Sequence, residues 1–238
     1  MVQNTIPEFP FRLLDLTHKI TRDMPTWPGD PLPECNKVAY SESDGYTLHS
    51  WLLSEHAGTH LGAPLHFHEG QDSVDRITVN SLIWPAVVLH LDARSIPGTS
   101  ITINEMRSLE VELGQLITSG SIVLLHTGWD TRWPDPNLVY EKDRAGDYLW
   151  PGFSREAAEW LIEERGARAL GTDAPGIDSG PDQIFEAGHF CASSGLPHLE
   201  NLANLEQMPS IGAFLLAAPL PFVGGSGSSA RVFGLLPR

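Results

Sequence analysis

Residues 54–70, SEHAGTHLGAPLHFHEG, place four histidines among glycines and a proline, and this stretch restricts the local fold more than any other. His56 and His60 are spaced as in many helical zinc sites, but the interspersed glycines and proline disfavour a helix interior. In an extended strand, two residues four positions apart stand roughly 13 Å from each other, too far to share one ion. The chain must therefore bend between them, and Gly58, which tolerates positive φ, can supply the bend.

The same stretch has the composition of a functional loop. His66 and His68 follow the first pair within the turn-rich segment. Loops on a rigid scaffold are where metal ligands and acid–base groups collect. Imidazole is a common zinc ligand, so four imidazoles in one segment predict a metal site. Gly62 stands where such a site would want another ligand, and glycine offers no side-chain donor.

The overall composition is that of an ordinary globular protein. The chain has 238 residues, of which 41% are hydrophobic and 19% charged. With no internal repeat or linker, we expect a single domain spanning residues 1–238. The formal net charge of -15, from 30 acidic and 15 basic residues, repels phosphate backbones and anionic membrane surfaces. We therefore expect neither a nucleic-acid nor a membrane partner.

Cysteine usage and the lack of a sorting signal predict a cytoplasmic protein. Cys35 and Cys191 lie far apart and form no CxxC pair, and the N-terminus has no basic region followed by an apolar one. No apolar run reaches membrane-spanning length. We expect both thiols to be free.

Local patterns predict a mixed α/β fold. Apolar, β-branched runs bounded by glycine or proline are typical of buried strands. They predict strands within residues 11–20, 46–54, 85–93, 120–129, 166–175 and 214–236. We expect helices at 102–117 and at 154–166, where Ser154 is a good N-cap and Gly166 a good C-cap.

Several motifs in order resemble one known family. HAGTHLGAPLHF resembles the HxGTHxDxPxHF signature of the metal-dependent cyclase/hydrolase family, which includes bacterial kynurenine formamidase and isatin hydrolase. The likeness continues through DLTHKITRDMPTWPGDP, VLLHTGWD, GTDAPGID, HLENLANLEQMP and PLPFVGGSGSSARVFGLL, nearly the whole chain. It implies an α/β domain with a mixed, barrel-like β-sheet core and flanking helices.

The resemblance also implies roles for individual residues. His56 and His60 match the first two metal ligands of the family, and His189 and Glu200 match the later ones. His66 matches the histidine that acts as acid–base catalyst. His198 is a rival to His189, although its place directly before Leu199 and Glu200 fits the pattern less well.

Gly62 is the main departure from the family, which has an aspartate there that often bridges two ions. We therefore expect a single ion, Zn or Mn, because two imidazoles and a carboxylate with open positions suit either. A second alternative is that Glu69 or Asp173 replaces the missing carboxylate. A third is a site without metal.

The resemblance implies a metal-dependent hydrolase of a small aryl formamide or cyclic amide, with a role in tryptophan catabolism. A metal-activated water would attack the carbonyl while His66 moves the proton to the leaving nitrogen. Trp27 would offer a flat wall to an aromatic small-molecule substrate. The alternatives are a ring-closing cyclase acting on a polyketide-like intermediate, or a degenerate, metal-free protein that binds a small ligand. Family likeness also implies a homodimer or homotetramer.

Overall fold

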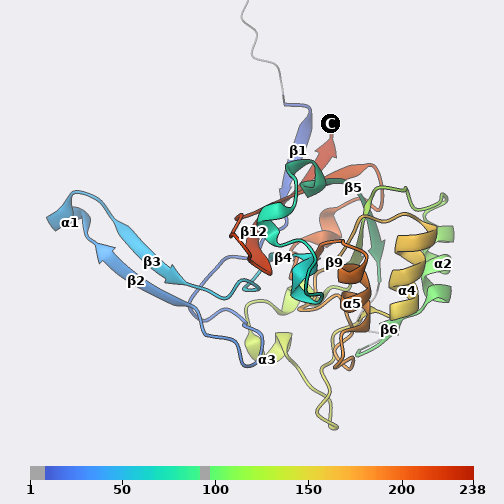
Figure 1. The fold of residues 1–238 in the computed structure, drawn as a ribbon, viewed down its shortest axis with the longest axis horizontal. Helices are drawn as coiled ribbons and strands as arrows, with labels where there is room; N and C mark the ends of the chain where they lie inside the picture. The colour runs from blue at the N-terminus through green and yellow to red at the C-terminus, as the bar shows by residue number, and fades with distance from the viewer. Residues whose placement is uncertain (1–8, 92–96) are drawn as a thin grey trace, which may run out of the picture.

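A closed ring of strands forms the centre of the computed structural model, which describes residues 9–91 and 97–238 (Figure 1). Within this part of the chain, eight strands form one sheet in the order β1-β12-β11-β5-β7-β9-β10-β4, and β12 also pairs with β4. That extra pairing closes a seven-stranded barrel and leaves β1 outside it, on β12. The barrel-like core expected from the family resemblance is confirmed.

The barrel mixes strand directions. Its strands are β4 (His60–Gly62), β5 (Ile83–His90), β7 (Ile122–His126), β9 (Ala169–Thr172), β10 (His198–Glu200), β11 (Ala213–Pro219) and β12 (Gly227–Pro237), and β1 is Phe11–Asp15. The run β5-β7-β9-β10 is parallel. The remaining pairs are antiparallel. Parallel strands need both faces covered, and the nearly continuous burial of β7 agrees with this.

Two hydrophobic cores lie on the two faces of the ring. Val88 packs in the cluster that the strands enclose, with Leu61, Leu124 and Leu215. Its neighbours Val87 and Leu89 point the other way, into a second cluster shared with the helices. This alternation is the period of two expected of a strand buried on both sides.

Three helices pack against that second cluster: α2 (Ile103–Glu112), α4 (Arg155–Glu159), which continues into the π-helical turn η6 (Trp160–Glu164), and α5 (Glu186–Ser193) (Figure 1). Thr102 forms a capping box with Glu105 at the start of α2. Ser154 caps α4, as expected, by accepting a hydrogen bond from the N–H of Ala157. The helix expected at 102–117 ends earlier, because Gly114 has a φ of 70° and breaks the helical path.

A long hairpin projects from the barrel (Figure 1). It consists of β2 (Glu34–Ala39), the short helix α1 (Ser41–Asp44) and β3 (Leu48–Leu52). Every residue of β3 is exposed, including the apolar Trp51 and Leu52. The sequence predicted β3 but not β2, whose charged and polar residues hide the strand pattern.

The remaining short elements include β6 (Ser100–Ile101), which pairs with β8 (Gly152–Phe153), and α3 (Pro136–Val139). Cys35 and Cys191 are both buried and unpaired. In the described ranges, no helix is both long and apolar enough to cross a membrane. Residues 1–8, on which the expected lack of a secretion signal partly rests, and residues 92–93 of the expected strand 85–93 lie outside the described residues.

Candidate functional site

One cavity of about 320 Å³ brings together five of the residues singled out in the sequence. His56, His60, His66 and Glu200 line it, and Trp27 forms part of its wall. The strands β4 and β10 are neighbours in the ring, and Glu200 is the direct cross-strand partner of His60. The pairing of β4 with β10 therefore joins two segments that are far apart in the chain.

A bend at Gly58 brings the first two histidines together, as the sequence required. Gly58 has a φ of 64°. The ring centroids of His56 and His60 then lie 5.0 Å apart with their planes nearly perpendicular. A 3-10 turn, η1 (Pro64–His66), follows β4 and returns His66 to the same cavity.

The buried side chain of His60 points its Nε2 toward the carboxylate of Glu200. Its Nδ1 lies 2.9 Å from the carbonyl oxygen of Gly58, which can only accept, so Nδ1 carries the hydrogen. In a neutral ring, Nε2 then holds a lone pair, and it lies 3.2 Å from Oε2 of Glu200. Two buried acceptors face each other only when a proton or a cation lies between them. A histidine that donates its other N–H to a carbonyl is the usual arrangement of a metal ligand, so these residues fit a divalent ion.

Glu200 is held as an anion. Burial alone would raise its pKa, but the contacts with His60 and His198 and the backbone N–H of Ile177 together hold the pKa below its ordinary value. The N–H of Ile177 donates to Oε1 at 3.1 Å. The carboxylate therefore keeps its charge and stays oriented inside the cavity.

His56 is oriented by two residues that the sequence reasoning missed. Ser226 donates its hydroxyl hydrogen to Oε2 of Glu55 at 2.6 Å. Its oxygen must then accept from Nε2 of His56, 3.0 Å away, which leaves a lone pair on Nδ1 of the imidazole. Burial, followed by the neighbouring imidazoles, lowers the pKa of His56 far below its ordinary value, so the ring stays neutral. Glu55 directly precedes His56, but nothing local to the sequence points to Ser226.

Five of the predicted site residues do not line the cavity: Gly62, Glu69, Asp173, His189 and His198. Gly62 and His198 are buried partners in the β4–β10 pair. His189 lies exposed on α5, with its ring 5.1 Å from that of Phe67. Glu69 is also exposed. Asp173 is buried, but its carboxylate accepts the backbone N–H groups of residues 127–129 and so ties β9 to the loop after β7.

His198, the rival of the exposed His189, is buried beside Glu200. It is 1% exposed, and its Nε2 lies 3.5 Å from Oε1 of Glu200. His60 and His198 therefore contact the two oxygens of the same carboxylate. Of the two rival histidines, the one beside Glu200 is His198.

Aromatic rings also line the cavity. Trp27 packs edge-on against Trp150, with ring centroids 5.8 Å apart, and lies 6.0 Å from the ring of Phe185. Phe67 and Tyr140 complete this aromatic lining. A cavity lined by several aromatic rings and a few polar groups fits a small aromatic molecule.

Asp178 lines the cavity but is engaged with the protein backbone. Its carboxylate accepts the N–H groups of Ala187 and Gly188 in the first turn of α5. Burial raises the pKa of Asp178 to about 8. This side chain fixes the helix that carries Phe185 at its start.

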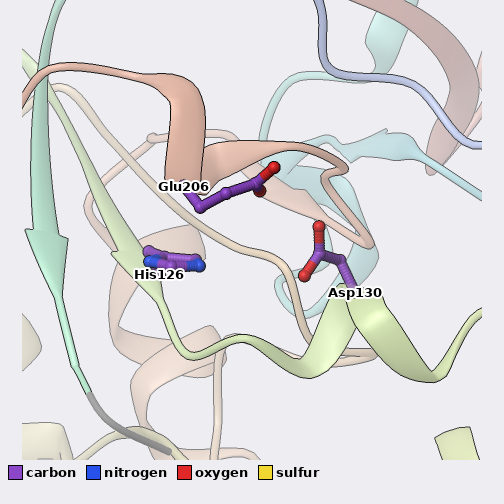
Figure 2. A group of neighbouring side chains, drawn as sticks. All are labelled: His126, Asp130 and Glu206. Carbon is purple, nitrogen blue, oxygen red and sulfur yellow. The ribbon is translucent and has the colours of Figure 1, made fainter.

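A second group of ligand-type side chains lies outside this cavity (Figure 2). His126, Asp130 and Glu206 place one ligand atom each within 4.8 Å of the others, which no three of His56, His60, His198 and Glu200 do. They come from β7, the turn η5 (Trp129–Arg132) and the turn η7 (Leu205–Gln207). The sequence pattern did not indicate that these three residues lie together. A measurement of bound metal per chain must therefore distinguish an ion at this group from an ion in the cavity.

Known proteins share the sequence pattern of this chain. The family model described as "Putative cyclase" matches residues 14–179. An isatin hydrolase from Roseibium aggregatum is 34% identical over 220 residues, covering 87% of this chain and 82% of the relative. A kynurenine formamidase from Salinibacter ruber is 26% identical over 221 residues, covering 92% and 95%.

Solved structures share the fold over nearly its full length. A crystal structure of an isatin hydrolase bound to the product analogue thioisatinate has a TM-score of 0.89 at 28% identity, covering 96% of this chain and 94% of the other. A potential metal-dependent hydrolase with cyclase activity has a TM-score of 0.73 at 25% identity, covering 96% and 99%. The mixed barrel and its flanking helices are common to these proteins.

Proposed function

Since the chain belongs to the cyclase family, we propose that it is a metal-dependent hydrolase that opens C–N bonds of small aryl amides, in a cyclic amide such as isatin or in an aryl formamide. The observation that carries the proposal is the buried contact of His60 with Glu200 in a cavity lined by aromatic rings. The names of the relatives supply the substrate class, and the cavity's flat walls agree with it.

His56, His60 and Glu200 would hold the ion, which we propose to be one Zn or Mn. His189 is left out of this set, because it lies exposed on α5. When bound, a divalent ion supplies a Lewis acid for the carbonyl and makes hydroxide available near pH 7.

The chain's own residues then position the substrate and move the proton. Trp27, Trp150 and Phe185 hold a planar ring and exclude water from its faces. Burial lowers the pKa of His66, so its imidazole is neutral near pH 7 and can accept a proton from water. Water adds to the carbonyl carbon, the C–N bond breaks, and His66 returns the proton to the leaving nitrogen. The products are a carboxylic acid and an amine.

The exposed hairpin β2–β3 supports the proposal that the protein forms a homodimer or homotetramer. Its apolar side chains, among them Leu48, Trp51 and Leu52, are exposed in the isolated chain. A second copy that packs on them would remove this surface from water. We also propose that residues 1–238 act as a single domain and that the protein is cytoplasmic.

The proposed activity is tested with isatin and N-formylkynurenine as substrates. An unmodified peptide serves as the negative control. Loss of substrate absorbance and formation of the ring-opened acid or free amine are followed for the metal-loaded protein. We expect turnover of at least one aryl amide and none of the peptide. Saturable binding of both aryl amides without turnover would contradict the proposal and favour a binding protein.

A further inference from the structure

Gly62 is fixed as glycine by the space around it. It faces His198 as direct cross-strand partner in the β4–β10 pair. A Cβ placed on Gly62 would lie 2.3 Å from both Cε1 and Nε2 of His198, closer than non-bonded atoms approach. Gly62 is not among the glycines with positive φ, so its backbone does not require glycine. A side chain at position 62 and the imidazole of His198 therefore exclude each other.

The imidazole that fills this space is buried and only partly satisfied. His198 is 1% exposed, and its Nδ1 has no hydrogen-bond partner among the described residues. Its Nε2 lies 3.5 Å from Glu200, beyond a strong hydrogen bond. A buried polar side chain without good partners costs free energy unless something absent from the protein binds it.

We propose that His198 supplies the metal ligand that position 62 lacks. The inference rests on the proposed function, because it concerns the same ion. The site then offers the imidazoles of His56, His60 and His198 and the one carboxylate of Glu200. Gly62 is the residue that makes room for the third imidazole.

An imidazole from His198 in place of a carboxylate at position 62 should change the preference of the site between Zn²⁺ and Mn²⁺. An aspartate at position 62 would add a second negative charge and an oxygen donor, which suit Mn²⁺. An imidazole adds a neutral nitrogen donor, which suits Zn²⁺. The parent chain should therefore favour Zn²⁺ over Mn²⁺ more strongly than a double variant that combines Gly62→Asp with His198→Ala.

The experiment is a thermodynamic cycle on the full-length protein stripped of metal. The variants are His198→Ala, Gly62→Asp and the double variant, with His68→Ala as the matched control because His68 is exposed in the same stretch. All carry Glu206→Gln, which disables the second ligand group through an exposed residue. Zn²⁺ and Mn²⁺ affinities are measured by chelator competition, and thermal unfolding without metal reports on folding.

We expect His198→Ala to weaken Zn²⁺ binding at least about tenfold. Gly62→Asp alone should lower the unfolding temperature, because the new side chain must displace the ring. The double variant should regain most of the lost affinity and shift the Zn²⁺-to-Mn²⁺ preference toward Mn²⁺. If His198 had a purely structural role, an aspartate at position 62 on the neighbouring strand would not restore the metal affinity that His198→Ala loses.

Two results would overturn the inference. One is Zn²⁺ binding by His198→Ala as tight as in the parent, while His60→Ala loses it; the metal site then stands without His198. The other is a double variant that folds but binds no better than His198→Ala. If the parent binds neither ion, the proposed function fails together with the inference.

Discussion

The imidazoles of His56 and His66 stack face to face, with ring centroids 3.8 Å apart and planes 30° from parallel. His56 is held at its Nε2 by Ser226, which in turn donates to Glu55. The stack therefore restrains the ring of His66, which also lies 4.3 Å from the ring of Phe67. His66 lines the cavity together with His56, His60 and Glu200, and we propose that it carries the proton there.

Replacing His66 should stop turnover without removing the ion. We expect His66→Gln to lower kcat roughly a hundredfold to ten-thousandfold, the usual worth of a general acid–base group. Zn²⁺ affinity should change little, because His66 is outside the proposed ligand set. Steady-state kinetics and chelator competition on the same preparation measure both quantities. A variant that keeps its kcat would remove His66 from the mechanism.

Trp27 should act on substrate binding. We expect Trp27→Ala to raise KM for an aryl amide roughly tenfold, because an aromatic contact and buried apolar area are lost. Trp51→Ala is the matched control, since Trp51 lies exposed on the projecting hairpin. Equal KM values for both variants would show that the substrate does not touch the Trp27 wall.

Asp173 should matter for stability, not for the ion. Its buried carboxylate accepts the hydroxyl of Thr127 and the N–H groups of residues 127–129. Removing it leaves several buried donors unpaired, so we expect Asp173→Ala to lower the free energy of unfolding by about 3 kcal/mol. Urea unfolding measures the loss, with the exposed Asp23→Ala as control. An unchanged unfolding midpoint would contradict this role.

His18 should make the fold sensitive to mild acid. Its ring stacks on Trp133 with centroids 4.4 Å apart, and burial lowers its pKa from 6.5 to about 4. The unfolded chain therefore binds the proton first, and stability is lost as the pH falls from about 6.5 toward 4. At most about 1.4 kcal/mol is lost per pH unit.

The variant His18→Phe keeps the stack and removes the proton site. Urea unfolding of parent and variant at pH 7 and pH 5 isolates the contribution of His18 from that of the other buried histidines. We expect the parent to lose more stability than the variant, by up to about 2 kcal/mol. Equal losses would show that His18 titrates normally.

Local features of the fold could be predicted from the sequence, and long-range ones could not. Neighbouring residues in the sequence were enough to predict the strand β7, the N-cap at Ser154 and the bend at Gly58. The contact between His56 and Ser226 spans 170 residues, and only barrel closure creates it. Gly62 departs from the aspartate of the family pattern, which the sequence shows, but its relation to His198 depends on the register of two strands. The family pattern pointed to His189, whereas the strand geometry places His198 beside Glu200.

A metal ion held by His60 and Glu200 is the central feature of the proposed site. The direct test is the rate of aryl amide hydrolysis and the Zn and Mn content of the protein before chelation, after it, and after reloading. Parent and His60→Ala are compared, both with Glu206→Gln to disable the second ligand group. We predict about one ion per chain in the parent, activity that is lost and recovered with that ion, and neither in His60→Ala. Hydrolysis that survives chelation, or a His60→Ala variant that binds and works like the parent, would contradict the proposed metal site.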